Sequence, residues 1–293
     1  MRKIVDKSML GKAWVVAYDK LENQGDLVKT ILTSRGVANA EKFLNPSIKE
    51  YMPDPSVLTD IDVAARVVAD AVQNKDKIAI YGDYDVDGIT STAIFVKYLR
   101  ALGADVIWHL PTREGEGYGL NNDAVDEISK DGTNLLITVD CGISGVEEVA
   151  HARSLGMRVV VTDHHSPDVT IPDADAVVNP KRIDDTSDLT YLAGVGVAFL
   201  TLVAINRELK SRGLGLDNSE LMNFMDLVAL GTICDTMPLV GLNRAFVATG
   251  LKVMGLRQNL GLRVLMDVAG IKKPSVYAAG FALGPRLNAA GRL

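Results

Sequence analysis

Residues 78–91 read IAIYGDYDVDGITS, an apolar run that ends abruptly in three carboxylates at alternate positions. The apolar run predicts a buried strand, and the residues after Gly88 have the pattern of a helix. Asp83, Asp85 and Asp87 repel one another, so a fold has no structural reason to gather them. A divalent metal ion among them would offset that repulsion. The alternative is a solvated acidic turn, and partners elsewhere in the chain decide between the two.

Segments on both sides of this stretch divide the chain into three parts. Residues 1–58 predict an N-terminal segment of short helices, interrupted by three prolines. Residues 59–190 alternate short apolar strands with helices, which predicts the α/β class, a parallel β-sheet flanked by helices. Residues 191–293 predict a mostly helical segment. The expected strands are 77–81, 105–110, 134–139 and 157–162, with a fifth candidate at 176–179. The expected helices are 60–74, 89–102, 122–129, 146–155, 195–210, 220–230, 242–254 and 260–268.

Other acidic residues and two histidines follow the later strands of this scheme. Asp140 follows the third strand, and Asp163, His164 and His165 follow the fourth. Because the carboxyl ends of parallel strands meet at one edge of a sheet, we expect these side chains to lie close to the first acidic stretch. Asp235 ends a predicted apolar helix and would fold back over the same edge. The sequence therefore favours a metal site over an acidic turn.

The mixture of ligands indicates the chemistry. Carboxylates and imidazoles together suit Mn²⁺, Fe²⁺ or Zn²⁺, and the excess of carboxylates favours a hard ion. Two ions are needed to offset so many negative charges. Two metals about 3.5–4 Å apart polarise a phosphoryl oxygen and generate a hydroxide near neutral pH. The sequence therefore predicts hydrolysis of a phosphoester, and a metal-dependent phosphatase for small molecules is one form of it.

The composition is that of an ordinary globular protein. The 293 residues are 47% hydrophobic and 23% charged, with a net charge of −6 that argues weakly against binding nucleic acid through bulk positive charge. No stretch approaches the roughly 18 uncharged apolar residues of a membrane span, and we expect neither a signal peptide nor contact with a membrane. Cys141 and Cys234 suit small apolar fillers in a reducing compartment. We therefore expect a cytoplasmic protein.

Five segments, in order, resemble the successive motifs of the DHH phosphoesterases. They are GDYDVDG at 82–88, VDCG at 139–142, DHH at 163–165, CD at 234–235 and GPRLNAAGR at 284–292. The tripeptide alone is a weak signal, but all five in order at strand ends are specific. Flanking segments such as EGYGLN at 116–121 and AGVGVA at 193–198 resemble the RecJ branch of the family, the 5′→3′ single-stranded-DNA exonucleases of DNA repair and recombination. The resemblance covers the chain from about residue 30.

The resemblance implies a role for each matching residue. Asp85, Asp87, Asp140, His164 and Asp235 match metal ligands, and Asp140 would bridge two ions, Mn²⁺ or alternatively Mg²⁺.

The remaining matches concern one further metal ligand and the substrate. Tyr81 occupies the place of a histidine ligand found in many relatives, and Asp83 would supply the missing ligand. His165 would face the scissile phosphate, and Asp163 would orient the histidine pair. The residues that would hold substrate phosphates are Arg286, Asn288 and Arg292.

Several readings stay open at this point. The family pairs the catalytic domain with a second, C-terminal domain, and its RecJ branch adds an oligonucleotide-binding domain; we expect neither in this chain. Relatives also cleave short oligoribonucleotides, cyclic dinucleotides, pAp or pyrophosphate, and some are catalytically silent scaffolds in replication complexes. The expected partners are single-stranded DNA and DNA-repair or replication proteins. Gly194 and Gly196 would either bind a phosphate or allow close helix packing, and Tyr118 is a candidate for base stacking, whereas Trp108 is expected in the core.

Overall fold

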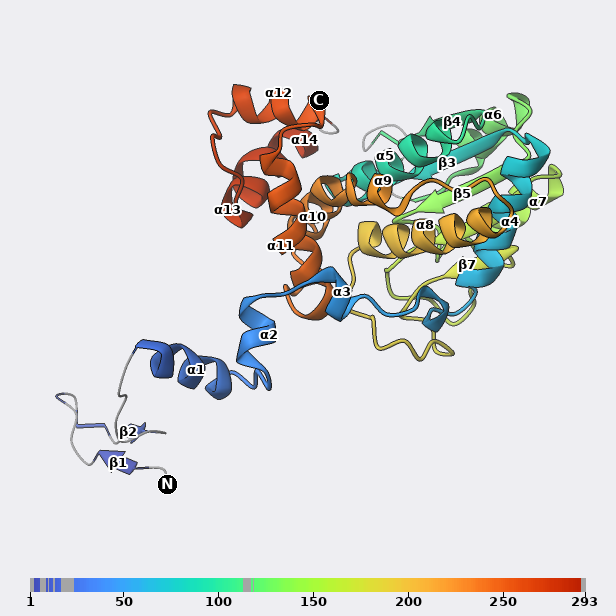
Figure 1. Cartoon of the computed structure of the whole chain (residues 1–293). Helices are drawn as coiled ribbons and strands as arrows, with labels where there is room; N and C mark the ends of the chain where they lie inside the picture. Colours follow the sequence, from blue (N-terminus) through green and yellow to red (C-terminus); the bar gives the residue numbers. More distant parts are fainter. Residues whose placement is uncertain are drawn as a thin grey trace. The chain divides into compact units, whose positions relative to one another are not determined.

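The computed structural model describes residues 3–5, 9, 11–12, 14–16, 24–112, 117 and 119–290. The chain divides into two compact units, Met1–Pro46 and Ser47–Leu293. In the first unit, β1 (Lys3–Val5) pairs antiparallel with β2 (Trp14–Val16), and α1 (Gln24–Ser34) and α2 (Ala40–Leu44) follow (Figure 1). The sequence predicts short helices here. The strands go unpredicted because three residues are too few to give a periodic signal.

The second unit is built on a five-stranded parallel sheet with the strand order β4-β3-β5-β6-β7. This confirms the predicted α/β class and the fifth candidate strand. The strands are β3 (Ile78–Gly82), β4 (Val106–His109), β5 (Leu135–Val139), β6 (Arg158–Thr162) and β7 (Ala176–Val178). Every residue of β3 and β5 is buried, because both faces of a parallel sheet are covered.

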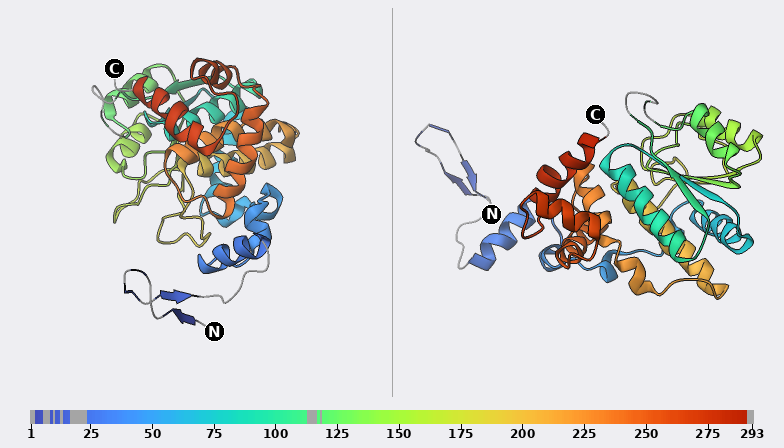
Figure 2. Two further views of the ribbon diagram at one scale, coloured as in Figure 1. Left: turned by 90° about the vertical axis from the view of Figure 1, so that its left-hand side faces the viewer. Right: turned by 90° about the horizontal axis from the view of Figure 1, so that it is seen from above.

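Helices cover both faces of the sheet. One face packs against α4 (Ile61–Asn74), α5 (Val86–Ala101) and α8 (Gly194–Ser211), and the other against α6 (Asn122–Lys130) and α7 (Val146–Ser154). Alternate residues of β3 show the division, since Ile78 and Ile80 join the first core and Ala79 and Tyr81 the second. Figure 2 shows α6 and α7, in green, on the side of the sheet opposite to α5 and α8.

Further helices introduce and complete the second unit. Ahead of α4 lie α3 (Ile48–Tyr51) and η1 (Pro55–Val57), and after α8 follow α9 (Asn218–Met222), α10 (Met225–Cys234), α11 (Gly241–Gly255), α12 (Leu260–Val268), α13 (Val276–Ala278), the π-helix η2 (Ala279–Leu283) and α14 (Gly284–Ala290). No helix of the described residues is long and apolar enough to cross a membrane.

Three expectations about local structure are wrong. The single helix expected at 220–230 is two helices, because Asn223 and Phe224 donate to carbonyls three residues back and tighten the chain between α9 and α10. Helix α5 begins at Val86 rather than residue 89, because the Asp85 side chain caps it. Trp108 is 54% exposed rather than in the core, because β4 is an edge strand.

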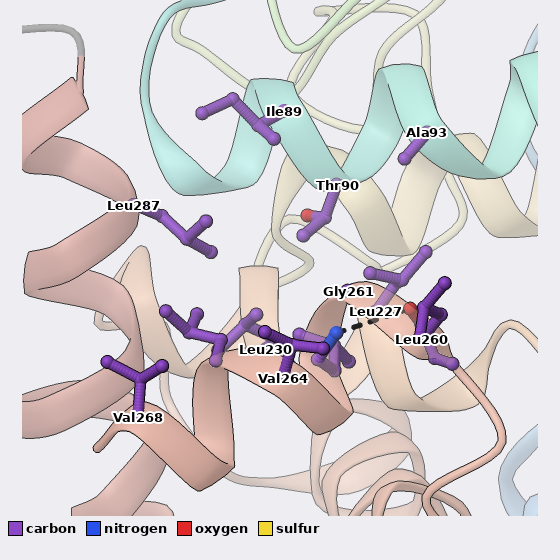
Figure 3. Close-up of a pocket in the computed structure, with 13 residues that line it drawn as sticks. Ile89, Thr90, Ala93, Leu227, Leu230, Leu260, Gly261, Val264, Val268 and Leu287 are labelled. Atoms are coloured by element: carbon purple, nitrogen blue, oxygen red, sulfur yellow. Dashed lines mark hydrogen bonds between the residues drawn. The ribbon is translucent and has the colours of Figure 1, made fainter.

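An apolar cavity of about 590 Å³ lies among helices of the second unit (Figure 3). Ile89 and Ala93 of α5 line one side, and Leu230 of α10, Val264 of α12 and Leu287 of α14 line others. None of the described residues that line it is acidic or a histidine. The cavity therefore offers no carboxylate or imidazole to a metal, and the acidic residues gather elsewhere.

Candidate metal centre

The acidic residues gather where the order of the strands reverses. Strand β3 lies between β4 and β5, so the connections that leave β3 and β5 diverge and open a crevice at their carboxyl ends. Asp83, Asp85 and Asp87 follow β3 directly, and Asp140 follows β5. The predicted gathering of these segments at one edge is confirmed, and the sheet order places it at the position where open α/β sheets bind ligands.

The acidic stretch is held by the first turns of two helices. Asp85 caps α5, its Oδ1 accepting from the backbone N–H groups of Asp87 and Gly88 at 2.8 and 3.1 Å. Asp87 is buried and accepts from the N–H groups of Gly194 and Val195, which begin α8, at 2.7 and 3.0 Å. These bonds use one lone pair of an oxygen each and leave further acceptor capacity on both carboxylates.

Asp140 is held in an uncommon backbone conformation. Its φ is +60°, in the left-handed region that non-glycine residues seldom adopt, and its N–H donates to the carbonyl of Thr162 at 2.9 Å. A Cβ on Gly194 would lie 2.2 Å from Asp140 Oδ1. The glycine therefore makes room for the carboxylate, which supports the close-packing interpretation of Gly194; its N–H is already bonded to Asp87.

His164 presents a lone pair to three carboxylates. Its Nδ1 donates to the carbonyl of Leu192 at 3.0 Å, so the hydrogen is on Nδ1 and Nε2 is an acceptor. Nε2 lies 3.2 Å from Asp140 Oδ1, 3.6 Å from Asp235 Oδ2 and 3.8 Å from Asp87 Oδ2. Burial lowers the pKa of His164 to about 4, so the ring is neutral at pH 7.

Three buried atoms at this point are unsatisfied. His164 Nε2, Asp140 Oδ1 and Asp235 Oδ2 have no hydrogen-bond partner among the described residues. All three are acceptors that face one another, and buried polar groups without partners are rare in native structures. A cation among them would satisfy all three at once. The residues therefore fit a divalent metal.

The electrostatics point the same way. Burial first, and the repulsion of neighbouring carboxylates second, raises the pKa of Asp87 and Asp140 well above the ordinary value. The pKa of Asp83 and that of Asp235 rise to about 6, mainly through burial. Burial and mutual repulsion oppose the ionisation of these carboxyl groups. Positive charge at the site would stabilise their ionised forms.

The ligand atoms form three overlapping groups. Asp87, His164 and Asp235 make one, Asp83, Asp85 and Asp140 a second, and the third joins Asp140 and His164 to His165. Within each group the atoms lie within 4.8 Å of one another. The first two groups share no residue, and the 3.2 Å contact between Asp140 and His164 links them. The arrangement has room for two ligand sets side by side.

Asp163 holds His165 rather than facing the cluster. Its carboxylate accepts four hydrogen bonds, from the N–H groups of Ile143, His164 and His165 and from His165 Nδ1 at 2.7 Å. Burial opposes ionisation, but the bonds from His165 outweigh it and lower the pKa of Asp163. The same bond raises the pKa of His165, whose side chain is 41% exposed. An exposed imidazole beside a buried carboxylate is equipped to donate a proton.

The remaining described candidates contribute no atom to the three ligand groups. Tyr81 points into the core under α6 and α7. Arg286 is exposed and donates to the carbonyl of Ala282 in its own helical turn, at 2.7 Å. Asn288 lies against the acidic stretch, and its Oδ1 accepts from the N–H of Val86 at 3.1 Å. Arg292 and Tyr118 lie outside the described residues.

Two features of the site escape sequence reasoning. The Leu192 carbonyl sets the tautomer of His164, and a backbone group leaves no trace in residue types. Asn179 is fully buried, and its Nδ2 donates to the carbonyl of His165 at 2.9 Å. A polar residue directly after the apolar strand β7 is the signal that would have found it.

The sequence is similar to proteins of one known family. Residues 77–232 match the model of the DHH family, N-terminal domain. The single-stranded-DNA-specific exonuclease RecJ of Salmonella typhimurium is 42% identical over 276 residues, which are 91% of this chain and 47% of the relative. RecJ of Bacillus subtilis is 39% identical over 91% of this chain and 33% of its own. The chain thus spans about half the length of the curated relatives it matches, or less.

Two solved structures share the fold. The crystal structure of exonuclease RecJ bound to manganese aligns with a TM-score of 0.71 and 39% identity, covering 80% of this chain and 58% of that one. RecJ from Thermus thermophilus in complex with Mn²⁺ aligns with a TM-score of 0.74 and 34% identity, covering 92% and 37%. The residues that match the DHH family model make up more than half of the present sequence, and they include every ligand candidate except Asp235. The chain belongs to the DHH family.

Proposed function

We propose that this chain contains the metal-dependent core of a 5′→3′ exonuclease specific for single-stranded DNA. The observation that carries the proposal is the convergence of His164 Nε2, Asp140 Oδ1 and Asp235 Oδ2, three buried acceptors without partners among the described residues. Support for the substrate comes from the relatives named single-stranded-DNA-specific exonuclease. Support for manganese comes from the solved relatives whose names include it.

The proposal assigns two Mn²⁺ ions to the ligand groups, with Mg²⁺ as the alternative. Asp87, His164 and Asp235 hold one ion, and Asp83 and Asp85 hold the other. Asp140 would contribute to both sets of ligands, since it belongs to the second group and contacts His164 of the first. Two ions supply a hydroxide nucleophile and polarise the scissile phosphate when they are bound.

His165 and Asp163 supply the proton chemistry in this proposal. Asp163 fixes the imidazole through Nδ1 and stabilises its protonated form. His165 then donates to a phosphoryl oxygen as charge develops there. Arg286, Asn288 and Arg292 bind the phosphates of the strand, and DNA-repair or replication proteins are the proposed partners. Asn288 already fixes the acidic stretch through Val86, so its contribution includes positioning.

Digestion of end-labelled DNA with Mn²⁺ tests the proposal. Single- and double-stranded oligonucleotides labelled at the 5′ or the 3′ end are compared, with chelated protein as control. We expect the 5′ label to be released first as a mononucleotide, from single strands only and only with metal.

Other substrates in the same assay distinguish the exonuclease from the alternatives. Faster turnover of diribonucleotides, cyclic dinucleotides or pAp than of DNA would replace the exonuclease with a small-substrate phosphodiesterase. Absence of both Mn²⁺ binding and hydrolysis in a folded preparation would indicate a catalytically silent scaffold.

A further inference from the structure

A second pocket, of about 360 Å³, adjoins the exposed ring of His165. Its wall comes from the segment after β5 and the start of α7, where Gly142, Ile143, Gly145 and Glu148 line it. Leu120, ahead of α6, also lines it, close to Gly145. His165 also touches the ring of His164, with centroids 4.5 Å apart. A substrate whose phosphate lies at the metal centre therefore has this pocket next to it.

The charge of the pocket argues against a phosphate as its occupant. None of the described residues that line it is Lys or Arg. The carboxylate of Asp163 is already engaged by four hydrogen bonds, so Glu148 supplies the negative charge that faces the pocket. A carboxylate repels phosphate oxygens and accepts hydrogen bonds from amino groups. The chemistry suits the uncharged part of a nucleotide.

The lining of the pocket combines bare backbone with apolar side chains. Gly142 has a φ of +102°, which only glycine adopts readily, and with Gly145 it exposes bare backbone beside the apolar side chains of Leu120 and Ile143. The segment that carries Leu120 is held in place by Tyr81, whose hydroxyl donates to the carbonyl of Gly119 at 2.8 Å. Apolar side chains and bare backbone, with a few polar groups such as Ser144 and Glu148 to orient the ligand, are typical of a site for a small aromatic ligand.

We propose that this pocket binds the nucleoside of the nucleotide whose phosphate lies at the metal centre. Glu148 accepts a hydrogen bond from the exocyclic amino group of adenine or cytosine. Thymine and guanine present a carbonyl oxygen at the corresponding place and do not make this bond. The inference rests on the proposed function for the position of the phosphate, and it adds a preference for the terminal base.

Gly145→Ala tests the pocket without disturbing the backbone. Gly145 has a φ of −82°, and a Cβ there would lie 3.4 Å from the Gly142 carbonyl oxygen, 3.5 Å from Glu148 Oε2 and 3.7 Å from Leu120 Cβ. These are ordinary contacts, so the methyl group occupies pocket space while the fold is kept. Gly255→Ala is the matched control, because its Cβ would meet a single atom, Pro274 Cδ, at 4.0 Å.

Calorimetric titration of the Mn²⁺-loaded protein with dAMP, dTMP and deoxyribose 5-phosphate provides the readout. We expect wild-type protein and the Gly255→Ala control to bind dAMP roughly tenfold more tightly than dTMP or the abasic sugar phosphate. Gly145→Ala should lose most of that difference while keeping the affinity for the sugar phosphate. Glu148→Gln should weaken dAMP several-fold and leave dTMP unchanged.

Equal affinities for the three compounds in the wild type, or an unchanged dAMP preference in both pocket variants, would overturn the inference. The digestion assay on the same preparation separates this failure from that of the proposed function. Exonuclease activity together with base-independent binding would contradict only the proposal for the pocket. Base-dependent binding in a protein that does not cleave DNA would support the proposal for the pocket and contradict the proposed exonuclease function.

Discussion

Asp140 and His164 show at the scale of single residues why the site needs a cation. Their facing atoms lie 3.2 Å apart, both are acceptors, and neither has a hydrogen-bond partner among the described residues. Without metal, protonation of the Asp140 carboxyl group relieves this repulsion. Burial first, and neighbouring carboxylates second, favour the protonated form and raise the pKa of Asp140 well above its ordinary value. The residues that bind metal in our proposal are therefore expected to destabilise the metal-free fold.

Asp140→Asn separates these two effects. The amide removes a buried charge and can donate to His164, so the metal-free protein should gain about 1 kcal/mol or more in its free energy of unfolding. Exonuclease activity should fall by at least about 100-fold, together with Mn²⁺ affinity. Thermal unfolding with EDTA or Mn²⁺ and the digestion assay measure both. Asp168→Asn, at an exposed position, is the control. A less stable metal-free variant would contradict the assignment.

His165→Ala tests the division of roles between the two histidines. Loss of a general acid should slow hydrolysis by about 10²–10⁴-fold, while calorimetry should give a Mn²⁺ affinity close to that of the wild type. The control is His151→Ala, because His151 pairs with Asp126 at 2.7 Å on the surface of the second unit. If His165→Ala loses metal to the same degree as His164→Ala, His165 is a ligand and the division is wrong.

At the scale of elements, the start of α8 connects the metal centre to the helical layer. The first two N–H groups of α8 donate to Asp87, and the missing side chain of Gly194 leaves space for Asp140. The helix N-terminus also stabilises the negative charge of Asp87 through its dipole. The position of α8 therefore determines the distance between the acidic stretch after β3 and the carboxylate after β5.

Gly194→Ala and Gly196→Ala form a matched pair for this element. A Cβ on Gly194 would lie 2.2 Å from Asp140 Oδ1 and forces a shift, whereas a Cβ on Gly196 would lie 3.5 Å from its nearest atoms, in Leu192. We expect Gly194→Ala to cost about 1–3 kcal/mol and to lower Mn²⁺ affinity. Gly196→Ala should change stability by less than about 1 kcal/mol and leave the affinity unchanged. Similar Mn²⁺ affinities in the two variants would show that the start of α8 does not determine the positions of the ligands.

At the scale of the whole second unit, the site concentrates buried groups that titrate together. In the window from the ordinary value of 3.8 up to about 6, Asp83 and Asp235 bind protons in the folded state but not in the unfolded one. Folding stability therefore falls as pH rises through this window. His164 acts in the opposite direction, since its pKa drops from 6.5 to about 4, but one imidazole opposes four carboxyl groups with raised pKa values.

The metal-free protein should therefore unfold at a higher temperature at pH 5 than at pH 7. With Mn²⁺ the order should reverse, because ligands must lose their protons before they bind the ion and binding stabilises the folded state. Melting curves recorded with EDTA and with Mn²⁺ at the two pH values measure this. A metal-free protein that melts lower at pH 5 would show that other groups govern its pH dependence.

The sequence by itself determined the class of the fold and nearly all of the ligand candidates. Apolar runs that end in Asp mark strands whose carboxyl ends meet, so Asp83, Asp140 and His164 follow from local patterns. It did not determine the exposed position of Trp108 or the break between α9 and α10, because both depend on which neighbours cover a residue.

Only the tertiary structure decided how the candidates divide. Asp163 and His164 are adjacent in the chain, yet one accepts four hydrogen bonds from the backbone and His165, and the other turns an unpartnered nitrogen to the carboxylates. That difference comes from the Leu192 carbonyl and from the approach of α8. Residue types and spacing indicate which groups are able to bind a metal. The direction in which each lone pair points depends on contacts between segments far apart in the sequence.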